Sequence, residues 1–255
     1  MARPRKLAAV KPILNISAYK FAGLNDTAGW RESIRSQAMA FDLKGTVLLA
    51  DEGINLFVAG IEVNVRAFLA WLVAQAPFGG LPVKESWSDS VPFGKLLVKV
   101  KPEIIRMNHP TIRPQVQRAP AVDAKTLARW LDAGVDDAGR EVVTLDTRNA
   151  FEVDHGRFAG ALDWRLGKFN EFPQVLRAHR GELEGRTVVS YCTGGIRCEK
   201  AALLMAEAGV ANVLQLDGGI LKYIEETGGK HFEGNCFVFD ERGTLNDTLA
   251  AVRAV

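Results

Sequence analysis

The stretch VVSYCTGGIRCEK, residues 188–200, holds the side chains best suited to chemistry. Cys192 follows an apolar run, and two glycines and an arginine come within the next five positions. A thiolate is the nucleophilic form of cysteine, and its pKa falls near cations and helix N-termini. Glycines let consecutive backbone N–H groups turn inward as an anion-binding nest, and a helix that begins near Cys198 points its positive end at the same place. The stretch therefore predicts a reactive thiolate, or a persulfide anion carried on the same sulfur.

The loop after the predicted catalytic residue, Cys192, consists of Thr193, Gly194, Gly195, Ile196, Arg197 and Cys198. Arg197 either adds a positive charge to the anion site or buttresses the loop. Four residues separate Cys192 from Arg197, one fewer than in the Cys-x5-Arg loop of cysteine phosphatases, and the tighter cradle suits a sulfur better than a phosphate. Cys198 allows two interpretations: it resolves an oxidised Cys192 as a disulfide, or it is a small buried residue at the start of the helix.

The second half of the chain, residues 122–231, alternates short apolar strands with helical segments. This pattern predicts a doubly wound α/β domain, in which helices cover both faces of a parallel sheet. Functional sites in such sheets lie beyond the carboxyl ends of the strands. Cys192 stands at one strand end, and Asp146 and Arg148 stand at the end of another. The latter two either orient the active-site loop or support the fold.

The first half of the chain predicts a different α/β domain. Between residues 12 and 107 the apolar patterns give the order β-α-β-β-α-β, which is typical of a split βαβ, ferredoxin-like sandwich. Gly53 closes the turn between the two central strands, where a glycine accepts a positive φ. Near this turn, Glu52 and Asn55 either face the second domain or serve the turn itself. The stretch GKLLVKVKPEIIRM, residues 94–107, predicts the last strand.

A linker rich in proline and basic residues, residues 108–121, joins the two domains, and a tail of residues 232–255 follows the second one. Residues 1–118 hold 16 Lys and Arg against 9 Asp and Glu, a net charge of +7, whereas the remainder holds 16 against 21, a net charge of −5. A basic half favours a polyanionic partner, and the alternative is a solvated basic face. The predicted nucleic-acid contacts in and before the linker are Lys101, Arg106, Arg113 and Arg118.

Composition excludes several classes of protein. Three cysteines in 255 residues do not form a disulfide framework, and they favour a reducing compartment. No stretch approaches the roughly 20 apolar residues of a membrane span, and the basic start lacks the apolar region of a secretory signal, so we predict a cytoplasmic protein. No Cys-x-x-Cys, His-x-x-x-His or Gly-x-Gly-x-x-Gly pattern occurs, and we therefore predict no metal site and no nucleotide cofactor.

Residues 122–231 resemble a single rhodanese domain, with LDTRNAFEVDHGRFAGAL as one signature and VVSYCTGGIRCEKAA as the active-site loop. Four stretches are more specific: CTGGIRCEK, ADEGINLFVAG near residue 50, LDGGILKYIEETG after residue 216 and FEGNCFVFDER after residue 232. With them, the chain resembles the bacterial tRNA uridine-34 hydroxylase family over residues 12–245. These proteins join a ferredoxin-like domain to a rhodanese domain.

The resemblance implies that the protein makes 5-hydroxyuridine at the tRNA wobble position, with tRNA as its partner and molecular oxygen as co-substrate. It also implies that Cys192 is the family's essential cysteine, which carries a persulfide. We expect no membrane association, because no stretch is long and apolar enough to span a membrane, and no protein partner is implied. Two alternatives stay open: a plain sulfurtransferase that carries a cysteine persulfide, and a non-catalytic binding module. Oxygen chemistry normally uses a metal, flavin or radical cofactor, and the residues themselves indicate only a reactive cysteine in an anion cradle.

Overall fold

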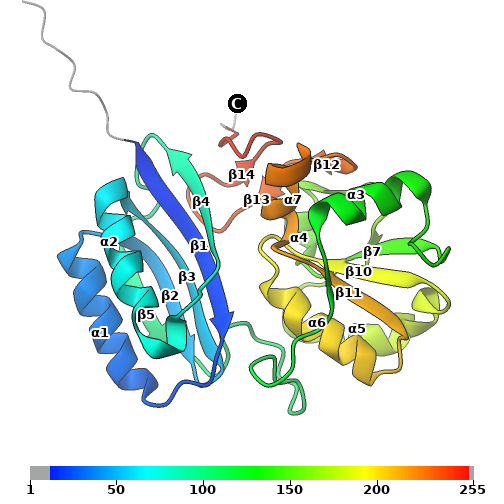
Figure 1. Cartoon of the computed structure of the whole chain (residues 1–255), viewed down its shortest axis with the longest axis horizontal. Coiled ribbons are helices and arrows are strands. Elements are labelled where there is room, and N and C mark those ends of the chain that lie inside the picture. The colour runs from blue at the N-terminus through cyan, green and yellow to red at the C-terminus, as the bar shows by residue number, and fades with distance from the viewer. Residues whose placement is uncertain (1–11, 253–255) are drawn as a thin grey trace, which may run out of the picture.

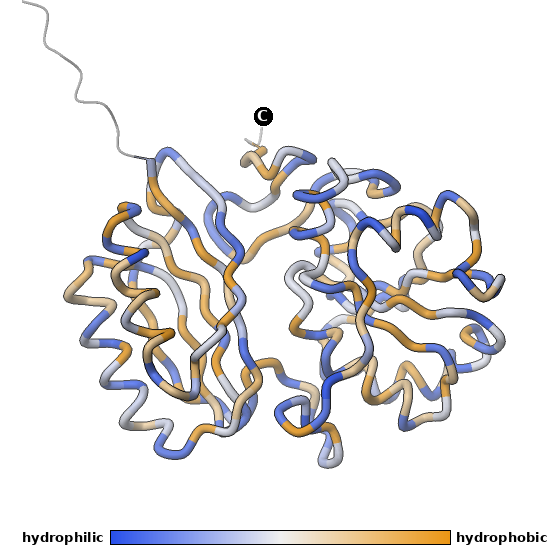
Figure 2. Tube along the Cα trace, in the orientation of Figure 1, coloured by the Kyte–Doolittle hydropathy of each residue, from blue (hydrophilic) through white to orange (hydrophobic). Residues whose placement is uncertain are grey.

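The computed structural model describes residues 12–252, which form two α/β domains side by side (Figure 1). Residues 1–11, the basic start of the chain, and residues 253–255 of the predicted tail lie outside the described residues. In the view of Figure 1 the linker runs along the bottom of the molecule, and the C-terminal segment returns toward the first domain at the top. Hydrophobic residues gather on the strands of both domains (Figure 2), and three apolar cores lie against the two sheets, one in the N-terminal domain and one on each face of the second sheet.

A five-stranded sheet forms the centre of the N-terminal domain. Its strands are β1 (Ile13–Phe21), β2 (Lys44–Ala50), β3 (Gly53–Ile61), β4 (Val83–Ser88) and β5 (Leu96–Val100). The order β4-β1-β3-β2-β5 is that of a ferredoxin-like sandwich to which β5 is added in parallel beside β2. The helices are α1 (Thr27–Ala40), α2 (Glu62–Val73) and the short 3₁₀ helix η1 (Ala76–Phe78).

The two faces of this sheet differ because side chains alternate along a strand. On β1, Leu14 and Ile16 belong to the apolar core beneath α1 and α2. Both helices lie on the face away from the second domain (Figure 1). The opposite face, which carries Ser17 and Tyr19, therefore looks toward the second domain.

The predicted last strand is shorter than expected. Only β5 pairs with the sheet, and residues 101–107 form no strand. Pro102 has no N–H to donate to a ladder, so the chain leaves the sheet at this point. Met107 is then buried in a core of the second domain. The expectation of a strand as far as Met107 is therefore wrong beyond Val100.

The second domain is built on a parallel sheet. Its strands are β6 (Ala121–Val122), β7 (Val142–Asp146), β9 (Leu162–Asp163), β10 (Thr187–Tyr191) and β11 (Asn212–Leu216). The order is β6-β11-β10-β7-β9, and every neighbouring pair is parallel. The helices are α3 (Ala124–Ala133), α4 (Ala150–Val153), α5 (Phe172–His179), α6 (Ile196–Glu207) and α7 (Gly219–Thr227), with 3₁₀ helices η2 (Phe169–Glu171) and η3 (Arg180–Leu183).

Helices cover both faces of this sheet. α5 and α6 bury one face, which includes Val188 of β10, whereas α3 and α7 bury the other, which includes Val189. The central strand is thus apolar on both sides, as parallel strands in doubly wound sheets are. The predicted fold class, a ferredoxin-like sandwich followed by a doubly wound parallel sheet, is confirmed.

The C-terminal segment connects the domains a second time. It forms β12 (Phe232–Gly234), which pairs with β8 (Gly156–Phe158), and then β13 (Cys236–Phe237), which pairs with β14 (Thr244–Leu245). Between β13 and β14, the guanidinium of Arg242 donates a hydrogen bond of 2.7 Å to Ser86 Oγ on β4. This contact fixes the tail against the sheet of the N-terminal domain.

Candidate active site

Cys192 lies directly after β10, at the carboxyl end of the central strand. The N–H of Gly195 donates to Cys192 Sγ at 3.1 Å, so the predicted inward turn of the backbone is present. Gly195 has a φ of 99°, which a glycine adopts without strain. Gly219 packs behind the loop, where a Cβ would lie 2.4 Å from the carbonyl oxygen of Cys192. α6 begins at Ile196, so its N-terminus points at the sulfur.

The surroundings of Cys192 favour its thiolate. Burial raises the pKa of this thiol, but a hydrogen bond from Cys198, the charge of Arg197 and two backbone N–H groups outweigh burial and lower the pKa to about 5. Burial and the neighbouring thiolate raise the pKa of Cys198. Cys198 is thus a protonated thiol that donates to Cys192, and it is buried in the first turn of α6.

Arg197 is buried between the Cys192 loop and α4. Its guanidinium makes two hydrogen bonds with the carboxylate of Glu152, at 2.6 and 2.8 Å. The side chains are only 6% and 0% exposed, respectively, which makes this a buried ion pair. The pair anchors the loop to α4, while the positive charge of Arg197 lowers the pKa of Cys192.

Asp146 and Arg148 form a second buried ion pair. Arg148 Nη2 lies 2.6 Å from Asp146 Oδ2, and neither side chain is exposed to solvent. Arg148 also donates to the carbonyl oxygen of Gly156 at 2.6 Å, which ties the end of β7 to β8. Neither side chain lines the pocket in front of Cys192. Their contacts are therefore those of residues that support the fold.

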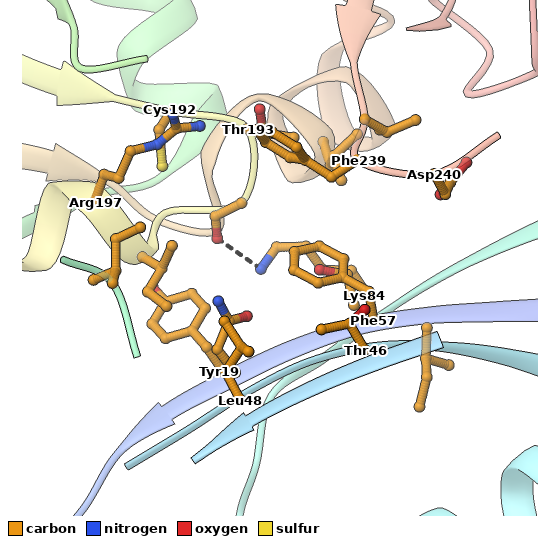
Figure 3. A pocket seen from close by; sticks show the side chains of 18 of the residues that line it. Tyr19, Thr46, Leu48, Phe57, Lys84, Cys192, Thr193, Arg197, Phe239 and Asp240 are labelled. Atoms are coloured by element: carbon orange, nitrogen blue, oxygen red, sulfur yellow. Dashed lines mark hydrogen bonds between the residues drawn. The ribbon is translucent and has the colours of Figure 1, made fainter. Parts of the chain in front are cut away.

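A pocket of about 520 Å³ opens from Cys192 toward the N-terminal domain. Figure 3 shows the loop with Cys192 and Arg197 on one side of it and the strands of the N-terminal sheet on the other. The sheet contributes alternate residues of β1, β2 and β3, namely Ser17, Tyr19, Thr46, Leu48, Asn55 and Phe57. The tail closes a third side with Phe239 and Asp240 (Figure 3). The site thus belongs to both domains.

Two side chains of the N-terminal domain, neither of them a predicted site residue, reach the loop that carries Cys192 and the helix behind it. The hydroxyl of Tyr19 donates to Glu199 Oε1 at 3.3 Å, and burial raises the pKa of Tyr19. Lys84 Nζ donates to the carbonyl oxygen of Gly194 at 3.0 Å. No motif marks either residue. The available signal was the alternation of side chains along β1 and β4. It predicts which residues share a face of the sheet, but not that this face lies against the second domain.

Lys200 joins the active-site helix α6 to the N-terminal domain. Its ammonium lies 2.9 Å from Glu52 Oε1 and 2.6 Å from Glu103 Oε2, and the side chain is only 2% exposed. Glu52 also accepts the backbone N–H of Ile104 at 2.8 Å. Of the two interpretations of Glu52, the one in which it faces the second domain is confirmed. Asn55, which donates to the Ile104 carbonyl at 3.3 Å, lines the pocket.

Lys200→Met is expected to lower the free energy of unfolding by about 2–3 kcal/mol, because two carboxylates lose the cation that they share. This loss is smaller than the loss expected on breaking a fully buried ion pair, because the side chains of Glu52 and Glu103 are 11% and 19% exposed. Urea denaturation at neutral pH measures the change. Lys99→Met, at an exposed position of β5, is the matched control and should stay within about 0.5 kcal/mol. Equal losses in the two variants would contradict the prediction.

The four predicted RNA contacts lie on the segment that joins the domains. The side chains of Lys101, Arg106 and Arg113 are exposed, and Arg106 also lines the pocket. Arg118 differs from them, because its guanidinium pairs with Glu199 at 3.0 Å and with Asp217 at 3.5 Å. Its charge is therefore partly neutralised within the protein.

The described part of the chain holds neither a cluster of metal-ligating side chains nor a helix able to span a membrane. Within residues 12–252, no group of three or more His, Cys, Asp or Glu side chains is arranged to hold a metal ion. Over the same range, no helix has the length and apolar character needed to cross a bilayer.

The chain matches known families over both domains. Residues 13–104 match the UPF0176 acylphosphatase like domain, and residues 124–226 match the rhodanese-like domain. A tRNA uridine(34) hydroxylase of Variovorax paradoxus is 60% identical over 242 residues, which cover 95% of this chain and 92% of that protein. The tRNA uridine(34) hydroxylase of Bordetella petrii is 61% identical over 243 residues, covering 95% and 96%.

The similar solved structures each match one domain of this chain. The solution structure of a rhodanese-like domain from an Anabaena protein is 24% identical, covers 45% of this chain and 79% of its own, and has a TM-score of 0.37. The relatives of known name, in contrast, align over nearly the whole chain at about 60% identity. The chain therefore belongs to the tRNA uridine(34) hydroxylase family.

Proposed function

We propose that the protein hydroxylates C5 of uridine 34 in tRNA to 5-hydroxyuridine, with molecular oxygen as co-substrate and Cys192 as the catalytic residue. Relatives at 60% and 61% identity carry the name of this activity. The observation that carries the proposal is the position of Cys192. Cys192, whose pKa is lowered to about 5, is among the residues that line a pocket of about 520 Å³ between the domains. Pockets of this class hold small ligands, and a single nucleotide turned out of an anticodon loop is such a ligand.

One route begins with addition of the thiolate to the uracil ring. The Cys192 Sγ–C6 bond forms, the C5=C6 π bond breaks, and its electron pair moves toward C5 and the C4 carbonyl oxygen. The electron-rich C5 then takes up O2 and a proton as a hydroperoxide. Two molecules of an external small-molecule thiol, the reductant of this route, reduce the hydroperoxide to a C5 hydroxyl and water and become a disulfide, because Cys192 is still bonded to C6. Loss of the C5 proton and departure of Sγ from C6 restore the double bond.

A second route uses a persulfide on Cys192. The cradle that favours a thiolate favours a persulfide anion in the same place. The outer sulfur takes up O2 and a proton as a hydroperoxide, and the electron pair of the C5=C6 bond attacks its outer oxygen. The C5–O bond forms as the O–O bond breaks, the other oxygen stays on sulfur, and loss of the C5 proton restores the double bond. The persulfide is then the two-electron reductant. Both routes require the Cys192 sulfur.

The substrate reaches the site through the region between the domains. Phosphate contacts dominate the affinity of proteins for nucleic acids. We assign such contacts to Lys101, Arg106 and Arg113, whose exposed side chains lie on the segment beside the pocket. We exclude Arg118 from this group because it is paired with Glu199. The proposed site of action is the cytoplasm, where the anticodon loops of tRNA are available.

The experiment is mass spectrometry of tRNA nucleosides from cells that lack this protein and from the same cells complemented with the wild-type chain. We expect 5-hydroxyuridine and its derivatives to disappear and to return on complementation. Levels that never depend on the protein would contradict the hydroxylase function. The alternative is a plain sulfurtransferase, and turnover of thiosulfate in the absence of any tRNA effect would support it.

A further inference from the structure

Lys84 is a cation of the N-terminal domain that faces the Cys192 loop. It comes from β4, lines the pocket, and donates from Nζ to the carbonyl oxygen of Gly194 at 3.0 Å (Figure 3). Its ammonium lies over the ring of Tyr19, 5.5 Å from the ring centroid. Within residues 12–252, Lys84 forms no ion pair with a carboxylate.

The other cations that line the pocket differ from Lys84. Arg197 and Arg242 are held by Glu152 and Asp240, respectively. The pocket cations Arg106 and Lys168 are exposed to solvent. Lys84 is half-buried and keeps two N–H donors beyond the one given to Gly194, because an ammonium has three.

The position of Lys84 disfavours the charged form of its side chain when no ligand is bound. Burial lowers the pKa of Lys84, and the attraction of the Cys192 thiolate and of Asp217 offsets this only in part. A half-buried ammonium without a carboxylate partner is thus stabilised further by any anion that enters the pocket. The surrounding walls carry apolar side chains such as Leu48 and Phe57, which suit a flat ring more than a phosphate.

We propose that Lys84 holds the negative charge that develops on a carbonyl oxygen of the bound uracil when Cys192 adds to C6. This inference rests on the proposed function, and specifically on its first route. In that step the Sγ–C6 bond forms and the electron pair of the C5=C6 bond is spread over C5 and the C4 oxygen. An ammonium beside that oxygen stabilises the adduct more than the free base, which is the condition for a catalytic contribution.

The test uses the full-length protein and a tRNA anticodon stem-loop, with uridine or 5-fluorouridine at position 34. With uridine, single-turnover formation of 5-hydroxyuridine is measured in air with a small-molecule thiol present, because the first route consumes two thiols. With 5-fluorouridine, the covalent protein–RNA adduct is measured, because its formation requires only addition at C6. Lys84→Met is expected to slow both rates about 10²- to 10³-fold at saturating RNA, as loss of an oxyanion donor does. Lys84→Arg should restore part of the rate, and Lys99→Met should behave as wild type.

A structural role would not produce the accompanying pH dependence. The ammonium is the active form, so the wild-type adduct rate should fall as the pH rises through the lowered pKa of Lys84. In Lys84→Met only the ionisation of the base at N3 should limit the rate at high pH, so with uridine, whose N3 proton is less acidic than that of 5-fluorouridine, the basic limb should lie at higher pH than in the wild type. The RNA dissociation constant of Lys84→Met should stay within about threefold of wild type.

The outcomes separate the inference from the function on which it rests. A wild-type protein that forms neither 5-hydroxyuridine nor adduct overturns both. A wild type that hydroxylates uridine but forms no adduct retains the function and overturns the role of Lys84. A third outcome also overturns the role of Lys84. If Lys84→Met is slower only because it binds RNA more weakly, and its RNA affinity depends less on salt, Lys84 contacts a phosphate instead.

Discussion

Cys192→Ser is expected to lower the rate of 5-hydroxyuridine formation by about 10³-fold or more, as removal of a nucleophile does in other enzymes. Both proposed routes use the sulfur, either as the group that adds to C6 or as the carrier of the persulfide. A pKa of about 5 leaves Cys192 ionised at neutral pH. A serine hydroxyl in the same cradle stays protonated and is a weak nucleophile. A single-turnover assay with purified protein and unmodified tRNA measures the difference.

The matched control is Cys236→Ala. Cys236 is also fully buried, but burial raises the pKa of its thiol to about 12, so it remains a thiol at neutral pH. Cys236→Ala should therefore retain hydroxylation within a few-fold of wild type. A normal rate in Cys192→Ser, or an equal loss in the two variants, would remove Cys192 from the chemistry.

The local features of the second domain were predictable because they follow from nearby residues. The parallel sheet follows from the alternation of strands and helices. The C-terminus of α3 follows from Gly134, which has a φ of 73° and ends the helix in the left-handed conformation. The Cys192 cradle follows from Gly194 and Gly195, which precede α6 directly. In each case the residues that decide the structure lie within a few positions of one another.

The pocket was not predictable from the same information. Lys84 and Gly194 are 110 positions apart, and they meet only because the N-terminal sheet turns its uncovered face to the loop. The end of β5 was misjudged because Ile104 and Met107 are apolar, yet Ile104 packs between the domains and Met107 packs in a core of the second domain. The pairing of Lys200 with Glu52 likewise depends on how the two domains meet.

These contacts change the interpretation of the N-terminal domain. Its sheet supplies one wall of the pocket, and Tyr19 and Lys84 reach the loop that carries Cys192. A plain sulfurtransferase would need only the loop and the rhodanese domain. The N-terminal sheet adds a second wall to the site and brings a lysine to the loop. These additions suit a substrate larger than a sulfur donor. The geometry thus favours the hydroxylase over the sulfurtransferase.

Glu152→Gln and Arg197→Met are expected to have similar effects on stability. Each leaves one member of a buried ion pair without its partner, and such changes lower the free energy of unfolding by about 3–5 kcal/mol. The double variant Glu152→Gln/Arg197→Met removes both charges and should lose less than the sum of the single losses, by about 1–3 kcal/mol. Urea denaturation of the four proteins measures this cycle. Additive losses would contradict a direct coupling between the two side chains.

The same two variants are expected to affect the Cys192 thiolate differently. Arg197→Met removes the positive charge that opposes the effect of burial, so the pKa of Cys192 should rise above its wild-type value of about 5. Glu152→Gln keeps the guanidinium, and the pKa should stay low. The ultraviolet absorbance of the thiolate, taken as the difference from matched Cys192→Ala proteins across pH, measures both values. If the thiolate drives hydroxylation, the acid limb of the rate should move to higher pH in Arg197→Met and stay in place in Glu152→Gln. Equal shifts in both would mean that Arg197 acts on Cys192 only by holding the loop in position.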